Sequence, residues 1–229
     1  QEFLNIASRA TINIHPSLLP RHRGATPVQS FLLSQEKKTG VTVLFTVKAL
    51  DAGNIIIQRE FPVKPDDRAA ELLSRLFKAS GPLLLQALNL LEDKSFRGLP
   101  QDEQAVSHCR KIKKEMGLLS WQDSAARLYA NFKAFTPWPG VFCFLGAKRL
   151  VLTDLCRLED KGYLELAKEE PGRFYYDKAL KLIVIKTGRG FLGLRRLKPA
   201  GSRELDCQSF WNGLSKELRQ SPLQGEASE

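Results

Sequence analysis

The chain has 229 residues, of which 43% are hydrophobic and 26% charged, an ordinary balance for one or two globular domains. It contains no apolar run long enough to span a bilayer as a helix, and its four scattered cysteines form no Cys-x-x-Cys pair, which argues against a zinc site or a disulfide framework. The formal net charge of +10 is concentrated in residues 105–200, where 19 Lys and Arg accompany 9 Asp and Glu, a distribution that favours a partner with a phosphate backbone over a merely solvated surface.

Residues 1–104 predict an α/β unit, because segments with β-branched and aromatic residues alternate with segments of helical spacing. The longest helix should begin after an N-cap at Asp66 or Asp67 and have a kink or a break at Gly81-Pro82. The expected elements, in chain order, are a strand ending at 12–15, a helix from Pro27 to residue 35, strands over 39–47 and 55–63, and a helix from 66 to about 92.

Residues 105–117 are charged and lack an apolar period, so we interpret them as a basic linker. Residues 118–214 predict a helix over 120–135, capped near Ser120 or Asp123, followed by five short strands and a closing helix. This pattern is typical of a Greek-key barrel of the OB type, with a small sandwich as the alternative. The strands are expected within 141–145, 148–158, 171–176, 181–187 and 190–198, the closing helix within 205–214, and a disordered tail over 215–229.

Asn13 and His15 lie two residues apart, so an extended backbone places both side chains on the same face. An Asn amide and a protonated His both donate hydrogen bonds, and such donors suit an oxyanion that develops on a carbonyl under attack. Asp51, in a loop between two predicted strands, is the candidate carboxylate that would orient the His and hold it charged. By spacing alone the ordinary alternative is stronger, because Asn and Asp are common turn residues.

The full motif is more informative than the spacing. NIHPSLLPRHRGATPVQ (13–29), followed by TGVT (39–42) and LDAG (50–53), resembles the folate-dependent formyltransferase family, whose members transfer a formyl group from 10-formyltetrahydrofolate to an amine. The resemblance implies the C-terminal part of a Rossmann-like domain and needs no metal. It gives Arg23 and Gly24 only a role in shaping the turn and gives His22 none. It implies a catalytic trio of Asn13, His15 and Asp51 and a folate-binding segment of Ser17, Leu18, Leu19 and Pro20.

The second half resembles the branch of this family that formylates methionyl-tRNA. The matching segments are 117–140 and 197–213, although sugar-nucleotide formyltransferases and 10-formyltetrahydrofolate dehydrogenase have a similar second domain. The basic excess favours tRNA, so the resemblance implies initiator methionyl-tRNA as the partner and a role in translation initiation. The residues expected to bind it are Arg110, Lys111, Lys113, Lys114, Arg189, Arg195, Arg196 and Lys198.

Two alternatives stay open at this point: formylation of an amino-sugar nucleotide, and a non-catalytic RNA-binding relative. Members of the family have several strands and helices before the motif, whereas here only eleven residues precede Ile12. We therefore expect an N-terminally truncated form that is inactive alone. We also expect a monomer without membrane contact, in an organelle (mitochondrion or plastid) or in the bacterial cytoplasm, between which the sequence does not distinguish.

Overall fold

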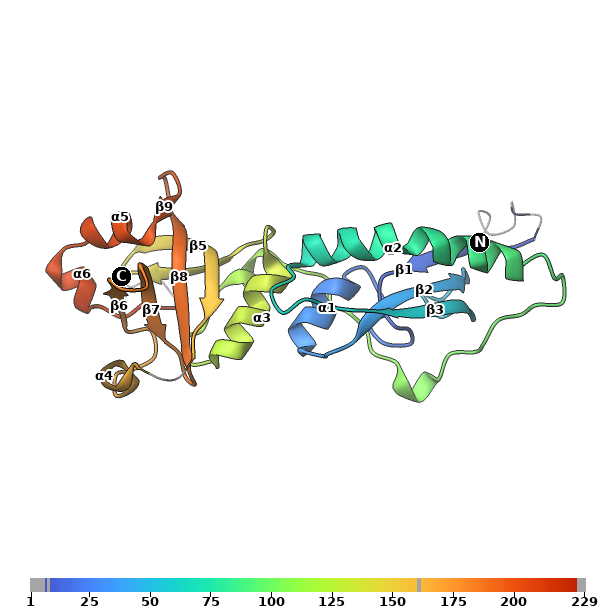
Figure 1. The fold of residues 1–229 in the computed structure, drawn as a ribbon, viewed down its shortest axis with the longest axis horizontal. Helices are drawn as coiled ribbons and strands as arrows, with labels where there is room; N and C mark the ends of the chain where they lie inside the picture. The colour runs from blue at the N-terminus through green and yellow to red at the C-terminus, as the bar shows by residue number, and fades with distance from the viewer. Residues whose placement is uncertain (1–6, 8, 160–161, 226–229) are drawn as a thin grey trace. The chain divides into compact units, whose positions relative to one another are not determined.

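The computed structural model describes residues 7, 9–159 and 162–225. These residues form two compact units, Gln1–Ile112 and Lys113–Glu229, each with its own sheet and helices (Figure 1). Within the described part of the chain, no helix is both long and apolar enough to cross a membrane.

The first unit is built on a three-stranded antiparallel sheet with the order β1-β2-β3. The central strand is almost entirely buried, as its run of β-branched and apolar residues predicts. Its pairing places His15 of β1 opposite Thr42 of β2. The strands are β1 (Ile12–His15), β2 (Thr39–Phe45) and β3 (Ile55–Phe61).

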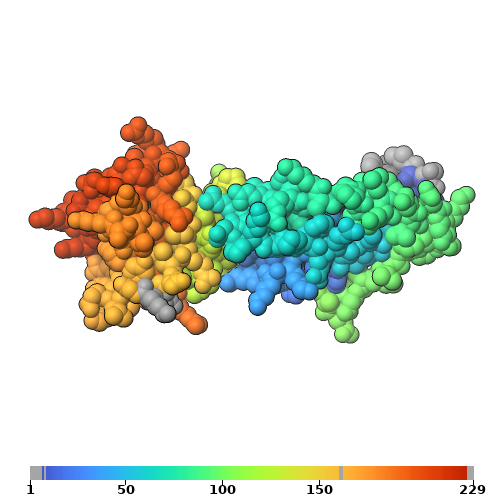
Figure 2. All heavy atoms as spheres, viewed as in Figure 1, coloured from blue at the N-terminus to red at the C-terminus, as the bar shows by residue number. Residues whose placement is uncertain are grey.

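Two helices complete this unit: α1 (Pro27–Ser34) and α2 (Ala69–Leu90), which packs against β2 and β3. In the space-filling view α2 covers much of the visible face of the unit (Figure 2). The buried residues of α2, among them Leu72, Leu76, Leu83 and Ala87, recur at the spacing of one helix face, so this face contributes to the core of the unit. Pro82 lies inside α2, and the helix continues through it.

The start of α2 differs from the expectation. The residue before the helix is Arg68, not Asp66 or Asp67. Asp67 is buried instead and accepts hydrogen bonds from the backbone N–H of Lys64, at 2.7 Å, and from the guanidinium of Arg75. The carboxylate therefore fastens the turn before the helix to its second turn, and the side chain of Glu71 accepts from the N–H of Arg68.

The segment after α2 returns to the loop that follows β1. The backbone N–H of Arg23 donates to the carbonyl of Ser107 at 2.8 Å, and the N–H of Cys109 donates to the carbonyl of Arg23 at 2.8 Å. A short 3-10 helix, η2 (Glu103–Ala105), precedes this pairing, and Ile112 is buried. Residues 105–112, expected in the linker, thus pack within the first unit.

The second unit contains a six-stranded sheet with the order β4-β5-β8-β7-β6, in which the short β9 pairs with the end of β8. All five expected strands are present, each within about three residues of the expected bounds. Helix α3 begins after Ser124, whose side chain accepts from the N–H of Arg127, so the cap is neither Ser120 nor Asp123. The elements are η3 (Lys114–Gly117), α3 (Ala125–Phe135), β4 (Val141–Leu145), β5 (Lys148–Arg157), α4 (Leu164–Ala167), β6 (Phe174–Asp177), β7 (Leu182–Lys186), β8 (Phe191–Pro199), β9 (Leu205–Asp206), α5 (Cys207–Asn212) and α6 (Lys216–Gln220).

The OB-type barrel expected from the sequence is not seen. In the strands that the structure describes, β4 and β6 end the two sides of the sheet and do not pair with each other. The outer edge of β4 is occupied by other segments, because Leu118 bridges to Phe142 and Gln224 bridges to Phe144. A strand edge that is already paired cannot close a barrel.

The chain end also differs from the expected disordered tail. Residues 216–220 form α6, and Leu223 is buried with only 4% of its surface exposed. The N–H of Leu223 donates to the carbonyl of Gly172 at 2.9 Å, so this segment is bonded to the body of the unit. Residues 226–229 of the predicted tail lie outside the described residues.

Candidate active site

The structure brings Asn13, His15 and Asp51 together at the end of β1. The side-chain amide of Asn13 donates to Oδ1 of Asp51 at 3.3 Å. The Nδ1 atom of His15 lies 3.6 Å from Oδ2 of the same carboxylate, and the side chains of His15 and Asp51 are only 5% and 6% exposed. Asn13 itself is exposed, so the cluster has one open side.

Asp51 reaches this position from the loop between β2 and β3, where it adopts a left-handed conformation with φ of 52°. Asp tolerates this region better than most residues. Its Oδ2 accepts from the backbone N–H of Gly24 at 2.8 Å. The loop is held by Gln101, whose amide donates to the carbonyls of Asp51 at 2.8 Å and Gly53 at 2.7 Å.

The contacts of the His15 ring indicate which nitrogens carry protons. Nε2 lies 3.0 Å from the backbone carbonyl of His22, which can only accept, so Nε2 is the donor. Nδ1 faces the carboxylate of Asp51, which is also an acceptor when ionised. A proton on Nε2 satisfies the His22 carbonyl, and a second proton on Nδ1 would place positive charge 3.6 Å from the Asp51 carboxylate.

The segment expected to line the folate site forms a tight loop after β1. Ser17 is fully buried and donates from its hydroxyl to the carbonyl of Arg21 at 2.7 Å. The backbone of Leu19 is bonded on both sides: its N–H donates to Oγ1 of Thr42 at 3.2 Å and its carbonyl accepts from the amide of Gln58 at 2.9 Å. Leu18 and Pro20 are half-buried, so they present the accessible surface of this loop.

Two residues that support the cluster, His22 and Gln101, were given no role from the sequence, and a third, Arg23, was given only a role in shaping the turn. His22 supplies the carbonyl that accepts from His15, Gln101 holds the Asp51 loop, and the buried Arg23 donates to Gln101 at 2.9 Å and pairs with Glu103 at 2.9 Å. Gln101 and Glu103 lie about 80 residues from Arg23 in the sequence, so no local pattern could identify them. The one available signal was Arg23 itself, which lies within the motif.

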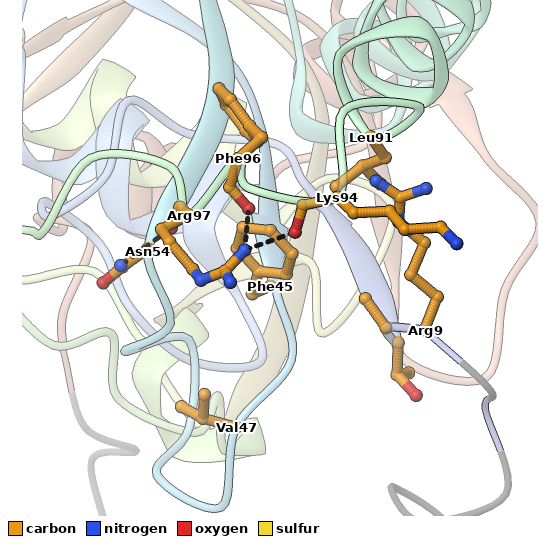
Figure 3. A pocket seen from close by; sticks show the side chains of 10 residues that line it. Arg9, Phe45, Val47, Asn54, Leu91, Lys94, Phe96 and Arg97 are labelled. Carbon is orange, nitrogen blue, oxygen red and sulfur yellow. Dashed lines mark hydrogen bonds between the residues drawn. The ribbon is translucent and has the colours of Figure 1, made fainter.

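A pocket of about 930 Å³ lies near the beginning of β1, between the ends of β2, β3 and α2 (Figure 3). Phe45 and Phe96 line it, and the guanidinium of Arg97 donates to the carbonyls of Lys94 and Phe96 at 2.7 and 3.1 Å. Asn54 donates to the carbonyl of Arg97 at 2.9 Å. None of the trio lines this pocket, so it is a separate feature from the cluster.

The basic residues expected to bind tRNA are all exposed. Arg110 and Lys111 belong to the first unit and the other six to the second. Two of them are already paired with carboxylates: Arg196 donates to Glu204 at 2.9 and 2.6 Å, and Arg195 lies 3.8 Å from Asp154. Among the described residues no cluster of His, Cys, Asp and Glu could hold a metal ion.

Comparison with known proteins defines the class. The model of the formyl transferase family matches residues 1–88, and that of the formyl transferase C-terminal domain matches residues 111–215. A solved structure of HypX from Aquifex aeolicus in complex with tetrahydrofolic acid has the same fold, with a TM-score of 0.64 and 22% identity over 88% of this chain and 34% of that one.

The most informative relatives are two methionyl-tRNA formyltransferases. That of Treponema denticola is 33% identical over 88% of this chain and 63% of its own length. That of Carboxydothermus hydrogenoformans is 30% identical over 100% of this chain and 70% of its own length. The chain belongs to the methionyl-tRNA formyltransferase family, and it spans 63% and 70% of the length of these two relatives.

Proposed function

We propose that the chain carries the reaction centre and the second module of an enzyme that transfers a formyl group from 10-formyltetrahydrofolate to the α-amino group of methionine on initiator tRNA. The observation that supports this most is the meeting of Asn13, His15 and Asp51 at the end of β1. The names of the relatives support the acceptor, and the folate complex of HypX supports the donor.

The reaction is an acyl transfer between two nitrogens. The neutral amino group attacks the formyl carbon, a new C–N bond forms, and the carbonyl oxygen becomes an oxyanion. The bond from this carbon to the folate nitrogen then breaks, and the proton lost by the attacking amine is balanced by one gained at the folate nitrogen. The protein must therefore stabilise negative charge on one oxygen and help one proton move.

The trio can divide these tasks. Asn13 uses one amide N–H on Asp51, and its other N–H, on the exposed side, is the donor we assign to the oxyanion. His15, protonated between Asp51 and the His22 carbonyl, contributes positive charge in a buried setting. Asp51 orients both side chains and is the nearest carboxylate for the proton of the attacking amine.

The solvent exposure of the side chains suggests which residues would contact the folate and the tRNA. Leu18 and Pro20 offer the surface on which the folate would rest, while Ser17 and Leu19 shape the loop beneath it. The second unit, whose five longer strands (β4 to β8) match the number in an OB fold although no closed barrel is seen in the described residues, would hold the tRNA through its exposed basic residues.

The test compares two proteins: the 229-residue chain, and a chimera in which the N-terminal segment of the Carboxydothermus relative precedes it. We expect the chimera to formylate methionyl-tRNA and Asn13→Ala to lower its kcat by about 10²–10³-fold, the usual loss for one oxyanion donor. Asn89→Ala, on the exposed face of α2, is the matched control and should have no effect. A loss below tenfold for Asn13→Ala would remove this residue from the reaction centre. Formylation of an amino-sugar nucleotide in place of methionyl-tRNA would overturn the acceptor.

A further inference from the structure

The carbonyl that accepts from His15 belongs to a residue in an unusual conformation. His22 has φ of 62°, in the left-handed region that residues other than Gly, Asn and Asp rarely adopt. Its carbonyl lies 3.0 Å from Nε2 of His15 in the buried part of the site. Something must hold His22 in this conformation for the carbonyl to stay in place.

The ring of His22 is held from two sides. Nδ1 lies 2.8 Å from the hydroxyl of Ser30, on helix α1, and Nε2 lies 3.2 Å from Oε1 of Glu36. The ring also packs edge-on against Phe31, with 6.4 Å between the ring centroids. Ser30 and Phe31 belong to α1 and Glu36 follows its end by two residues, so these contacts tie the ring to α1 and to the segment after it.

The protonation of the His22 ring agrees with its contacts to Ser30 and Glu36. Burial lowers the pKa of His22 below its ordinary value, although Glu36 opposes the shift. A neutral ring that carries its proton on Nε2 has that proton on the side of Glu36, 3.2 Å away, and accepts from the Ser30 hydroxyl at Nδ1. On the backbone side, the N–H of His22 donates to the Ser107 hydroxyl at 2.9 Å.

We propose that His22 is a positioning residue for His15: Ser30 and Glu36 anchor its ring, and its carbonyl keeps Nε2 of His15 protonated and Nδ1 turned to Asp51. The importance of this for catalysis rests on the proposed function. The orientation of the His15 ring does not, since it can be measured without any substrate.

The first experiment measures the ring of His15 in the 229-residue chain by nitrogen-15 NMR. The chain has only three histidines, so single His→Gln variants assign the spectrum. His22→Phe keeps an aromatic ring, although a larger one, beside Phe31 and removes both anchoring nitrogens, whereas Glu36→Gln removes the charge alone. In both variants we expect the Nε2 proton of His15 to exchange with water about tenfold faster, the size of effect that loss of one hydrogen bond gives.

Two controls make this result specific. Ser34→Ala, on the same helix, removes a hydroxyl that donates only to Phe31, and it should leave the His15 spectrum unchanged. Arg21→Ala removes the guanidinium that lies 3.0 Å from Oε1 of Glu36 and leaves Glu36 beside His22, so it too should leave the His15 spectrum unchanged. An unchanged His15 spectrum in His22→Phe and Glu36→Gln would overturn the proposal. If His22→Phe fails to fold, Glu36→Gln decides alone.

The second experiment uses the chimera. There, Glu36→Gln should lower kcat by roughly tenfold with an unchanged KM, because a reorientation of the reacting group affects the chemical step more than binding. A chimera that transfers no formyl group even with the natural residues would refute the proposed function while leaving the NMR result to stand. An equal loss with Ser34→Ala would show a general weakening of α1 and refute the positioning role.

Discussion

Asp51→Asn tests the centre of the site with the smallest change in shape. The two carboxylate oxygens accept from two different donors: Oδ1 from the amide of Asn13 and Oδ2 from the N–H of Gly24. An asparagine has one oxygen, so its NH₂ group must face one of these donors and that hydrogen bond is lost. Asparagine also tolerates the left-handed backbone at this position, so strain does not obscure the result.

The magnitude follows from these contacts. The bond from Gly24 is charge-assisted at 2.8 Å, and the carboxylate is 6% exposed. If the new NH₂ group replaces Oδ2, the charge-assisted bond is lost and the partly buried N–H of Gly24 has no acceptor, which together cost about 2–4 kcal/mol. For a urea slope of about 2 kcal/mol per molar, the midpoint of unfolding of the first unit should fall by about 1–2 M. Glu60→Gln, which removes the exposed partner of Lys38, should cost less than about 1 kcal/mol.

The chain itself offers probes that separate its two units. Histidine resonances report only the first unit and tryptophan fluorescence only the second, because the residues concerned are His15, His22 and His108 on one side and Trp121, Trp138 and Trp211 on the other. We expect Asp51→Asn to shift the transition seen by the histidines and to leave the tryptophan transition in place. A histidine midpoint that moves no more than in Glu60→Gln would refute the argument that Asp51 is held by two obligatory donors.

Three further results are expected. Gly53→Ala should destabilise the first unit by more than about 2 kcal/mol, because the added Cβ in the loop that carries Asp51 would lie 1.7 Å from the carbonyl oxygen of Phe45. A urea midpoint equal to that of the natural chain would contradict this prediction. Burial lowers the pKa of His22, so below the ordinary value of 6.5 the unfolded chain binds more protons than the folded one, and the free energy of unfolding should fall as the pH drops from 7 to 5. His22→Phe should flatten this dependence, as measured by urea midpoints over the same pH range. The 229-residue chain should bind tRNA with an affinity that falls steeply with salt. Lys198→Ala should reduce the slope of log affinity against log salt concentration by about one unit, whereas Lys38→Ala, in the first unit and paired with Glu60, should not change it. If filter binding detects no affinity at low salt, tRNA is not the partner of these basic residues.

The sequence by itself determined the elements whose signal is local. The apolar run of β2, the helical spacing of leucines in α2 and the turn residues between β4 and β8 each depend on neighbours within a few residues, and each element lies close to where the pattern places it. The motif after β1 likewise identified the family, because its order of residues is contained in one short segment.

Only the tertiary structure decided which distant residues meet. Asp51 is 38 residues from Asn13, and the approach of its loop depends on Gln101, a further 50 residues along the chain. The sequence could not indicate a role for His22, because a backbone carbonyl is common to every residue and its direction depends on φ and on the contacts of the ring. No closed barrel is seen in the described strands, and part of the predicted tail is ordered, for the same reason. Gln224 pairs with Phe144 at the edge of β4, and this competition between distant segments for one strand edge has no local signal.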